Sequence, residues 1–153
     1  MSAAVSFVRD TDHWLLKLSP SEWIRAATAE LRRAEAAYER RDPRGGLAGA
    51  KRAAGMALNG ALIVEPDESW GRTYVDHIAA IARDPRVPER VREAGRELSE
   101  SAPPSPAKLA MLRSAKTDAR ALEATRDLIA HAYAVVARYP DAERDDAAGE
   151  DAS

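Results

Sequence analysis

The sequence contains no cysteine and few aromatic side chains. Without cysteine the chain can form neither disulfides nor thiolate zinc sites, and it has no thiol nucleophile. The three histidines are far apart in the sequence, so it predicts no histidine-rich metal site and no cofactor. Aromatic residues make up 5% of the chain. That scarcity argues against a sheet protein, because strands are enriched in aromatic and β-branched residues.

Long hydrophobic runs are missing as well. No stretch approaches the roughly 18 apolar residues of a membrane span, and the N-terminus lacks the pattern of a signal peptide. We therefore expect a cytoplasmic protein without a membrane segment. The length of 153 residues fits one domain with one hydrophobic core.

Alanine is abundant, and apolar residues recur at helical spacing. Ser19, Pro20 and Glu22 have the arrangement of a capping box with proline at the first helical position, and they predict the start of a long helix that ends in "RRDPRGG". A second helix is predicted over 47–64. Its glycines and alanines indicate a central helix that its neighbours approach closely.

Three further helices follow from the pattern. Two short ones are expected over 70–83 and 88–99, separated by "DPRVPE". After the proline-rich "SAPPSP", a long last helix is expected over 105–139. The apolar stripe of this last helix is predicted to contain Leu109, Leu112, Ala119, Leu122, Ile129, Tyr133 and Val136.

These elements predict an all-α fold, a four- to five-helix up-and-down bundle over residues 19–139. Residues 1–18 form an N-terminal extension, and residues 140–153 form an acidic tail that we expect to be disordered. The tail carries a net charge of −5, so the rest of the chain carries about +3. A body of that charge could bind an anion but is not a strong nucleic-acid footprint.

The stretch "RDLIAHAY", residues 126–133, contains the candidate site. On a helix Arg126 and His131 lie about 7.5 Å apart along the axis and about 140° apart around it, so they flank a groove. Arginine binds phosphate oxygens through its guanidinium fork, and histidine transfers protons near neutral pH. Such a pair suits phosphate chemistry on RNA.

The arginine–histidine spacing alone carries little information. With 19 arginines and three histidines, it should occur by chance about 0.4 times, and Arg72 with His77 repeats it. Requiring a tyrosine two residues after the histidine lowers the chance expectation to roughly 0.01. The full pattern therefore depends on Tyr133.

On the last long helix of a small all-α protein, "RDLIAHAY" resembles the Arg-x4-His-x-Tyr motif of the HEPN family (higher eukaryote and prokaryote nucleotide-binding domains). The helical layout of residues 19–139 is similar too. The resemblance implies a homodimer whose motif helices meet, acting as a metal-independent endoribonuclease of the toxin type. In this group the antitoxin is a minimal nucleotidyltransferase that attaches AMP to the tyrosine.

Carried over, Arg126 would bind the phosphate, His131 would transfer a proton and Tyr133 would be the modification site. The family often has asparagine after the arginine, whereas this chain has Asp127, which could orient Arg126 but repels phosphate. Some relatives have lost nuclease activity. The alternative function is therefore a non-catalytic HEPN-like subunit that binds a nucleotide or a nucleotidyltransferase partner.

Simpler interpretations also apply. Arg126 could pair with Glu123 or Asp127, His131 could pack at a helix interface, and Tyr133 could belong to the apolar stripe. His77 is interpreted as structural because its surroundings are apolar. His13 is interpreted as a surface or packing residue, and the tryptophans as core or interface anchors, namely Trp14, Trp23 and Trp70.

Overall fold

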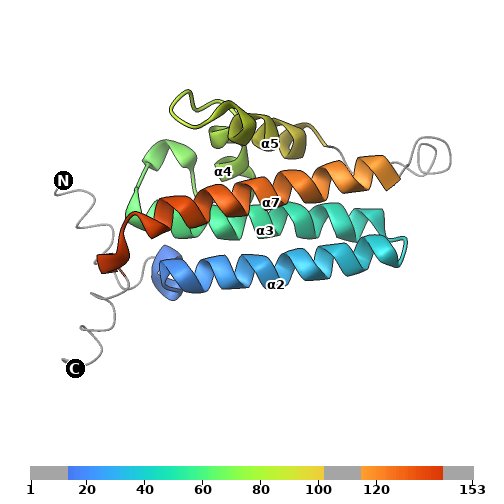
Figure 1. Ribbon diagram of the computed structural model, residues 1–153, viewed down its shortest axis with the longest axis horizontal. Helices are drawn as coiled ribbons and strands as arrows, with labels where there is room; N and C mark the ends of the chain where they lie inside the picture. Colours follow the sequence, from blue (N-terminus) through green and yellow to red (C-terminus); the bar gives the residue numbers. More distant parts are fainter. Residues whose placement is uncertain (1–13, 102–114, 143–153) are drawn as a thin grey trace.

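The computed structural model describes residues 14–101 and 115–142, and every regular element among them is helical. Four helices alternate in direction along the bundle (Figure 1): α2 (Pro20–Glu39), α3 (Pro43–Val64), α5 (Glu89–Glu100) and α7 (Ala115–Ala137). The described residues also include a short helix α4 (Tyr74–Ile81) and the 3-10 turns η1 (Trp14–Lys17) and η2 (Glu68–Trp70). The predicted all-α up-and-down bundle is confirmed.

Helix α2 begins where the sequence predicts. The hydroxyl of Ser19 accepts a hydrogen bond from the backbone N–H of Glu22 at 3.2 Å, and the Glu22 carboxylate accepts one from the N–H of Ser19 at 2.9 Å. The indole N–H of Trp23 donates to the carbonyl of Leu15 at 2.8 Å. Because Leu15 is buried, the described end of the N-terminal extension packs on the bundle. Residues 1–13 lie outside the described residues.

Helix α3 is the central helix, as predicted, and its glycines lie against neighbouring elements. A Cβ atom on Gly49 would lie 3.1 Å from the Cβ of Ala34 in α2. On Gly55 it would lie 2.2 Å from the Cβ of Tyr74, at the start of α4. Larger side chains at these two positions would force the helices apart.

The start of α3 differs from the prediction by four residues. Asp42 caps the helix by accepting a hydrogen bond from the N–H of Gly45 at 2.9 Å, and Pro43 occupies the first helical position. The glycines at 45 and 46 obscured this start, because glycine has low helix propensity and adds nothing to an apolar pattern.

The helix predicted over 70–83 is present as α4, but it covers only Tyr74–Ile81. Gly71 has a φ of 72°, which ends the turn η2 after Trp70. Helix α4 then starts afresh with Thr73 as its cap, whose hydroxyl accepts from the N–H of Asp76 at 3.0 Å. Helix α5 begins and ends within one residue of its predicted bounds.

Helix α7 packs with a different face from the predicted one. Val136 is buried, and Leu122 and Ile129 are partly buried, but Tyr133 and Ala119 are exposed. The buried face instead contains small residues that let α2 and α3 come close, namely Ala121, Ala124, Thr125, Ala132 and Val135, together with Leu128. Leu109 and Leu112 lie outside the described residues.

The last described residues follow α7 directly. Pro140–Ala142, the first residues of the tail that was predicted to be disordered, are helical, and the N–H of Ala142 donates to the carbonyl of Tyr139 at 3.1 Å. The remainder of the predicted acidic tail, residues 143–153, lies outside the described residues. Within the described part of the chain, none of the helices combines the length and the apolar character that crossing a membrane requires.

Candidate functional site

The residues of the predicted motif leave α7 in different directions. Arg126 reaches α2, where its Nη2 donates to the Glu35 carboxylate at 2.9 Å, and both side chains are partly exposed. Neither Glu123 nor Asp127 is the partner of Arg126. The arginine therefore joins two helices in the folded chain, and its side chain remains accessible from solvent.

Asp127 faces α5 instead of supporting Arg126. Its carboxylate accepts from Arg90 at 3.2 Å, and Glu123 lies 3.8 Å from the same guanidinium. This exposed ion-pair cluster links α5 to α7. In the folded monomer Asp127 is thus committed to Arg90 and leaves Arg126 without its help.

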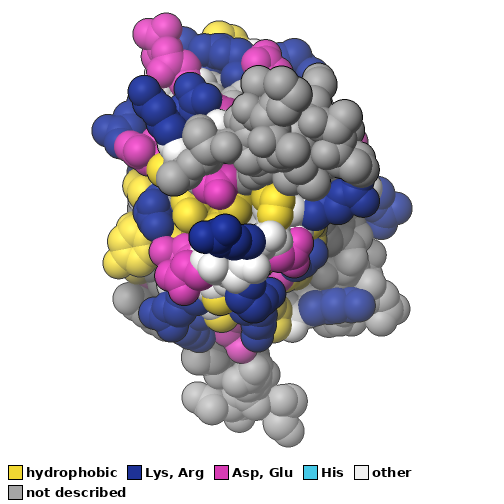
Figure 2. Space-filling model, turned by 90° about the vertical axis from the view of Figure 1, so that its right-hand side faces the viewer, with side chains coloured by type: hydrophobic (Ala, Val, Ile, Leu, Met, Phe, Trp, Pro, Cys, Tyr) yellow, Lys and Arg dark blue, Asp and Glu magenta, His cyan; other side chains and the backbone are white. Residues whose placement is uncertain are grey.

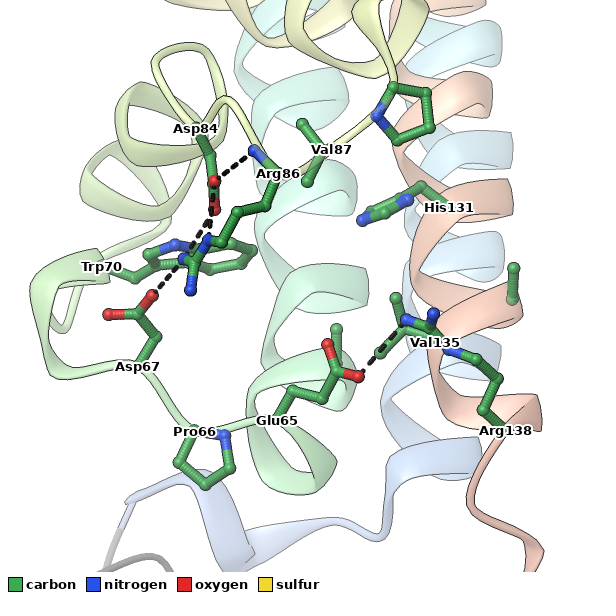
Figure 3. A pocket seen from close by; sticks show the side chains of 13 residues that line it. Glu65, Pro66, Asp67, Trp70, Asp84, Arg86, Val87, His131, Val135 and Arg138 are labelled. Atoms are coloured by element: carbon green, nitrogen blue, oxygen red, sulfur yellow. Dashed lines mark hydrogen bonds and ion pairs between the residues drawn. The ribbon is translucent and has the colours of Figure 1, made fainter.

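His131 projects from α7 into a pocket of about 700 Å³ (Figure 3), which we call the His131 pocket. Its other walls come from the end of α3 and from the loops on either side of α4. The charged and aromatic residues of this lining are Glu65, Asp67, Trp70, Asp84, Arg86 and Arg138. Neither ring nitrogen of His131 has a hydrogen-bond partner among the described residues. The imidazole is therefore available to a ligand or to water.

The surroundings of His131 favour its neutral form. Burial lowers the pKa of His131, and the positive charge of Arg138 lowers it further, while Glu65 and Asp84 act in the opposite direction. An imidazole whose pKa lies below its usual value is unprotonated at neutral pH. It can accept a proton without first losing one.

Arg86 is the most firmly held charged group of the pocket. Its Nε and Nη2 atoms donate to the two oxygens of Asp84 at 2.9 and 2.8 Å, and Nη2 also donates to Asp67 at 2.8 Å. Hydrogen bonds from Arg86 hold the pKa of the buried Asp84 below its usual range. Burial alone would raise the pKa of Asp67, but hydrogen bonds from Ser69 and Arg86 outweigh it. The pocket thus presents a guanidinium already neutralised by two carboxylates.

The opposite rim of the pocket is closed by Glu65. Its carboxylate accepts from Arg138 at 3.3 Å and from the hydroxyl of Tyr139 at 2.7 Å. That hydrogen bond raises the pKa of Tyr139. With three carboxylates and two arginines, the pocket offers no excess of positive charge to a phosphate dianion.

The sequence did not identify these pocket residues as site candidates. Asp67, Asp84 and Arg86 lie in "EPDES" and "DPRVPE", which were interpreted only as breaks between helices. The available signal was that both loops contain aspartate next to proline, and loops of this kind commonly fix a backbone geometry through side-chain hydrogen bonds. These two loops meet because α4, which lies between them in the sequence, packs on α3, and the sequence alone does not indicate that contact.

One side of α7 is left uncovered, and we call it the open face of α7. It is formed by exposed residues at alternating spacings of four and three, namely Ala119, Glu123, Arg126, Ala130, Tyr133 and Ala137. Tyr133 is 65% exposed, which is high for a large aromatic residue. The expectation that Tyr133 packs in the core was wrong. The alanines would let another helix approach closely.

The remaining histidines and tryptophans have structural positions where they are described. His77 is fully buried, and its Nδ1 lies 2.9 Å from the carbonyl oxygen of Trp70, as expected for a structural residue. Trp23 and Trp70 are both buried. The side chains of His13 and Trp14 lie outside the described residues. In the described part of the chain, no group of three or more His, Asp or Glu side chains is arranged to hold a metal ion.

Comparisons with protein-family models, with curated proteins and with solved structures give no match for this chain. Any functional inference therefore depends on the open face of α7, the His131 pocket and the motif residues themselves.

Proposed function

We propose that this protein is a homodimeric, metal-independent endoribonuclease of the HEPN type. The observation that carries the proposal is the open face of α7, on which Arg126 and Tyr133 are both exposed beside alanines. Small residues at this spacing fit a close contact between helices. A second copy of α7 on this face would bring two copies of the motif together, as the resemblance implies.

A second copy is needed because one chain separates the two residues proposed for the reaction. Arg126 contacts α2, whereas His131 points into the pocket beside the loops around α4. His131 lies about 140° around α7 from Arg126 and does not point to the open face. The proposed site therefore forms where Arg126 of one protomer reaches the mouth of the pocket that holds the partner's His131.

The chemistry follows from the properties of the two side chains. Neutral His131 takes the proton of a ribose 2′-hydroxyl, whose oxygen forms a bond to the adjacent phosphorus while the bond from phosphorus to the 5′-oxygen breaks. The imidazolium returns the proton to the leaving 5′-oxygen. Arg126 stabilises the charge on the phosphate oxygens during this exchange. The products are a 2′,3′-cyclic phosphate and a 5′-hydroxyl.

The ion pair between Arg126 and Glu35 does not prevent phosphate binding. Both side chains are partly exposed, and exposed ion pairs contribute only about 0–1 kcal/mol. A phosphate group with two oxygens facing the guanidinium can displace the single Glu35 oxygen that Arg126 contacts.

The test measures cleavage of a labelled RNA oligonucleotide in the presence of EDTA. Arg126→Ala and His131→Ala should each reduce the rate by at least about a hundredfold. Arg120→Ala is the matched control, because Arg120 is an exposed arginine of the same helix. Wild-type protein should leave ends with a 2′,3′-cyclic phosphate. Unchanged cleavage by both motif variants would contradict the proposal.

A second candidate function is a non-catalytic subunit that binds a nucleotidyltransferase partner. The exposure of Tyr133 favours it, because a modifying enzyme needs access to the hydroxyl. The commitment of Asp127 to Arg90 is also compatible with a site that does not cut. If the purified protein cleaves no RNA while such an enzyme attaches AMP to it at Tyr133, this second function replaces the first.

A further inference from the structure

A group of exposed arginines on α2 and on the turn to α3 forms no ion pair or hydrogen bond between helices among the described residues. We call this group the α2 arginine row, and it consists of Arg25, Arg32, Arg40, Arg41 and Arg44. Within the described part of the chain, no side chain of the row takes part in an ion pair or a hydrogen bond. On the α4–α5 side of the bundle, Arg86 and Arg90 do bind carboxylates.

The acidic residues of α2 compensate the charge of the row only in part. Glu22 accepts a hydrogen bond from the N–H of Ser19 and also interacts electrostatically with Arg25. Buried Glu30 binds Arg33 and Arg52, and Glu35 binds Arg126. Glu39 is the one acidic side chain of this helix without a bonded partner in the described residues. Three exposed carboxylates, Glu22, Glu39 and Asp42, stand against the five arginines of the row, so this surface keeps a net charge of about +2.

The row lies beside the open face of α7. Helices α2 and α7 run in opposite directions (Figure 1), and the pair of Glu35 with Arg126 fixes their register. Farther along, Ile24 and Ala27 pack in one cluster with Ala132. On this register Arg32 and Arg25, seven residues apart on one side of α2, lie level with the stretch of α7 that contains Tyr133.

The row continues around the end of the bundle. Arg40 and Arg41 follow the last turn of α2, and Arg44 lies in the first turn of α3. Figure 2 looks onto this end, where Lys and Arg side chains are spread over the surface with acidic side chains between them. From Arg25 to Arg40, along α2, the row spans roughly 22 Å, which is long enough for several nucleotides.

We propose that the α2 arginine row binds the phosphate backbone of single-stranded RNA and leads the strand past the open face of α7. The choice of RNA as the ligand rests on the proposed function. The exposure of the row's arginines is observed independently of that function. Arginines without partners contribute little to stability, whereas each one can form a two-pronged contact with a phosphate. Single-stranded RNA fits best, because the row turns from the side of α2 onto the end of the bundle at Arg40 and Arg44, and a flexible strand can follow that turn.

The experiment measures binding separately from cleavage. The probe is a fluorescein-labelled 12-nucleotide 2′-O-methyl oligouridylate, which lacks the hydroxyl that would attack the phosphate. Its affinity is measured by fluorescence anisotropy at several salt concentrations, with the full chain as wild type and as two double variants. Circular dichroism checks that each variant is folded.

The two double variants change the net charge equally. Arg25→Glu with Arg32→Glu alters the row. Arg83→Glu with Arg96→Glu is the matched control, because both residues are exposed, have no bonded partner among the described residues, and belong to the α4–α5 side of the bundle, away from α2 (Figure 1). Any difference between these variants reflects position and not total charge.

We expect the row variant to raise the Kd about tenfold and the control about twofold or less. For the row variant the slope of log K against log salt should fall by about 0.7 for each phosphate that the protein no longer neutralises. Equal weakening by both variants, no binding by the wild type, or tighter binding to duplex RNA or to vesicles of anionic lipid would overturn the proposal. If the row variant weakens binding but the wild type cuts no RNA, the row stands and the proposed nuclease function fails.

Discussion

Arginines serve two different purposes on the two sides of this bundle. Beside the His131 pocket, Arg86 is fixed by Asp84 and Asp67, and it ties the loops around α4 to each other. On α2, Arg25 and Arg32 are exposed and bind no carboxylate in the described residues. The charge of Arg86 holds loops in place, whereas the guanidinium groups of Arg25 and Arg32 are open to solvent and to a ligand.

The His131 pocket and the α2 arginine row differ in both shape and net charge. The His131 pocket is the larger hollow, but its arginines are neutralised by neighbouring acids. The α2 arginine row borders only a smaller hollow, of about 430 Å³ at Arg44, and it keeps the net positive charge that attracts a polyanion. A deep pocket and a phosphate-binding surface are therefore different places on this molecule, and they meet only at α7.

Removing Asp84 should have the largest effect on stability. Asp84→Ala leaves the backbone N–H of Arg86 and part of its guanidinium without an acceptor, so the free energy of unfolding should fall by about 2 kcal/mol. The measurement is urea denaturation followed by circular dichroism. The matched control is Glu39→Ala on α2, expected to change the value by less than about 0.5 kcal/mol. Equal effects would mean that the two sides do not differ as described.

Much of the fold could be predicted, because each helix start has a local chemical signal. Ser19 and Glu22 form a capping box, and this interaction involves only residues three apart. The two errors, at Pro43 and at Trp70, both occur beside glycine. A glycine leaves the chain free to continue a helix or to leave it, and tertiary packing decides which.

The site was harder to predict, because it depends on the rotation of one helix. The large residues Leu122, Ile129 and Tyr133 indicated one apolar face, whereas the closeness of α2 and α3 selected the neighbouring face of small residues. That rotation exposes Tyr133 and turns His131 into the pocket. The contact of Arg126 with Glu35 joins residues 91 positions apart, and no local pattern could indicate it.

A smaller effect is expected on the titration of His131. Arg138→Gln removes a positive charge that lowers the pKa of His131, so this pKa should rise toward its usual value. The measurement is an NMR titration of the imidazole signals, with Arg96→Gln as the control that leaves the pKa unchanged. A fall in the pKa of His131 on removal of Arg138 would contradict the electrostatics of the pocket.

The same substitution should alter the dependence of stability on pH. As the pH falls below the ordinary histidine value of about 6.5, the unfolded chain takes up a proton at position 131 that the folded chain does not. The free energy of unfolding therefore decreases as the pH falls toward the pKa of folded His131. In Arg138→Gln that loss should be smaller, because the two pKa values lie closer together.

The smallest effect is expected where the two uses of arginine meet. Glu35→Gln removes the carboxylate that binds Arg126, and it should convert Arg126 from a paired arginine into one that resembles the α2 arginine row. Affinity for the 2′-O-methyl oligouridylate should rise about two- to threefold, because an exposed ion pair of this kind is worth less than about 1 kcal/mol. Stability should change little for the same reason.

Glu97→Gln, on α5, removes an equal charge far from α2 and serves as the control. If both variants bind the probe equally, Glu35 does not compete with phosphate for Arg126, and the open face of α7 is not continuous with the row.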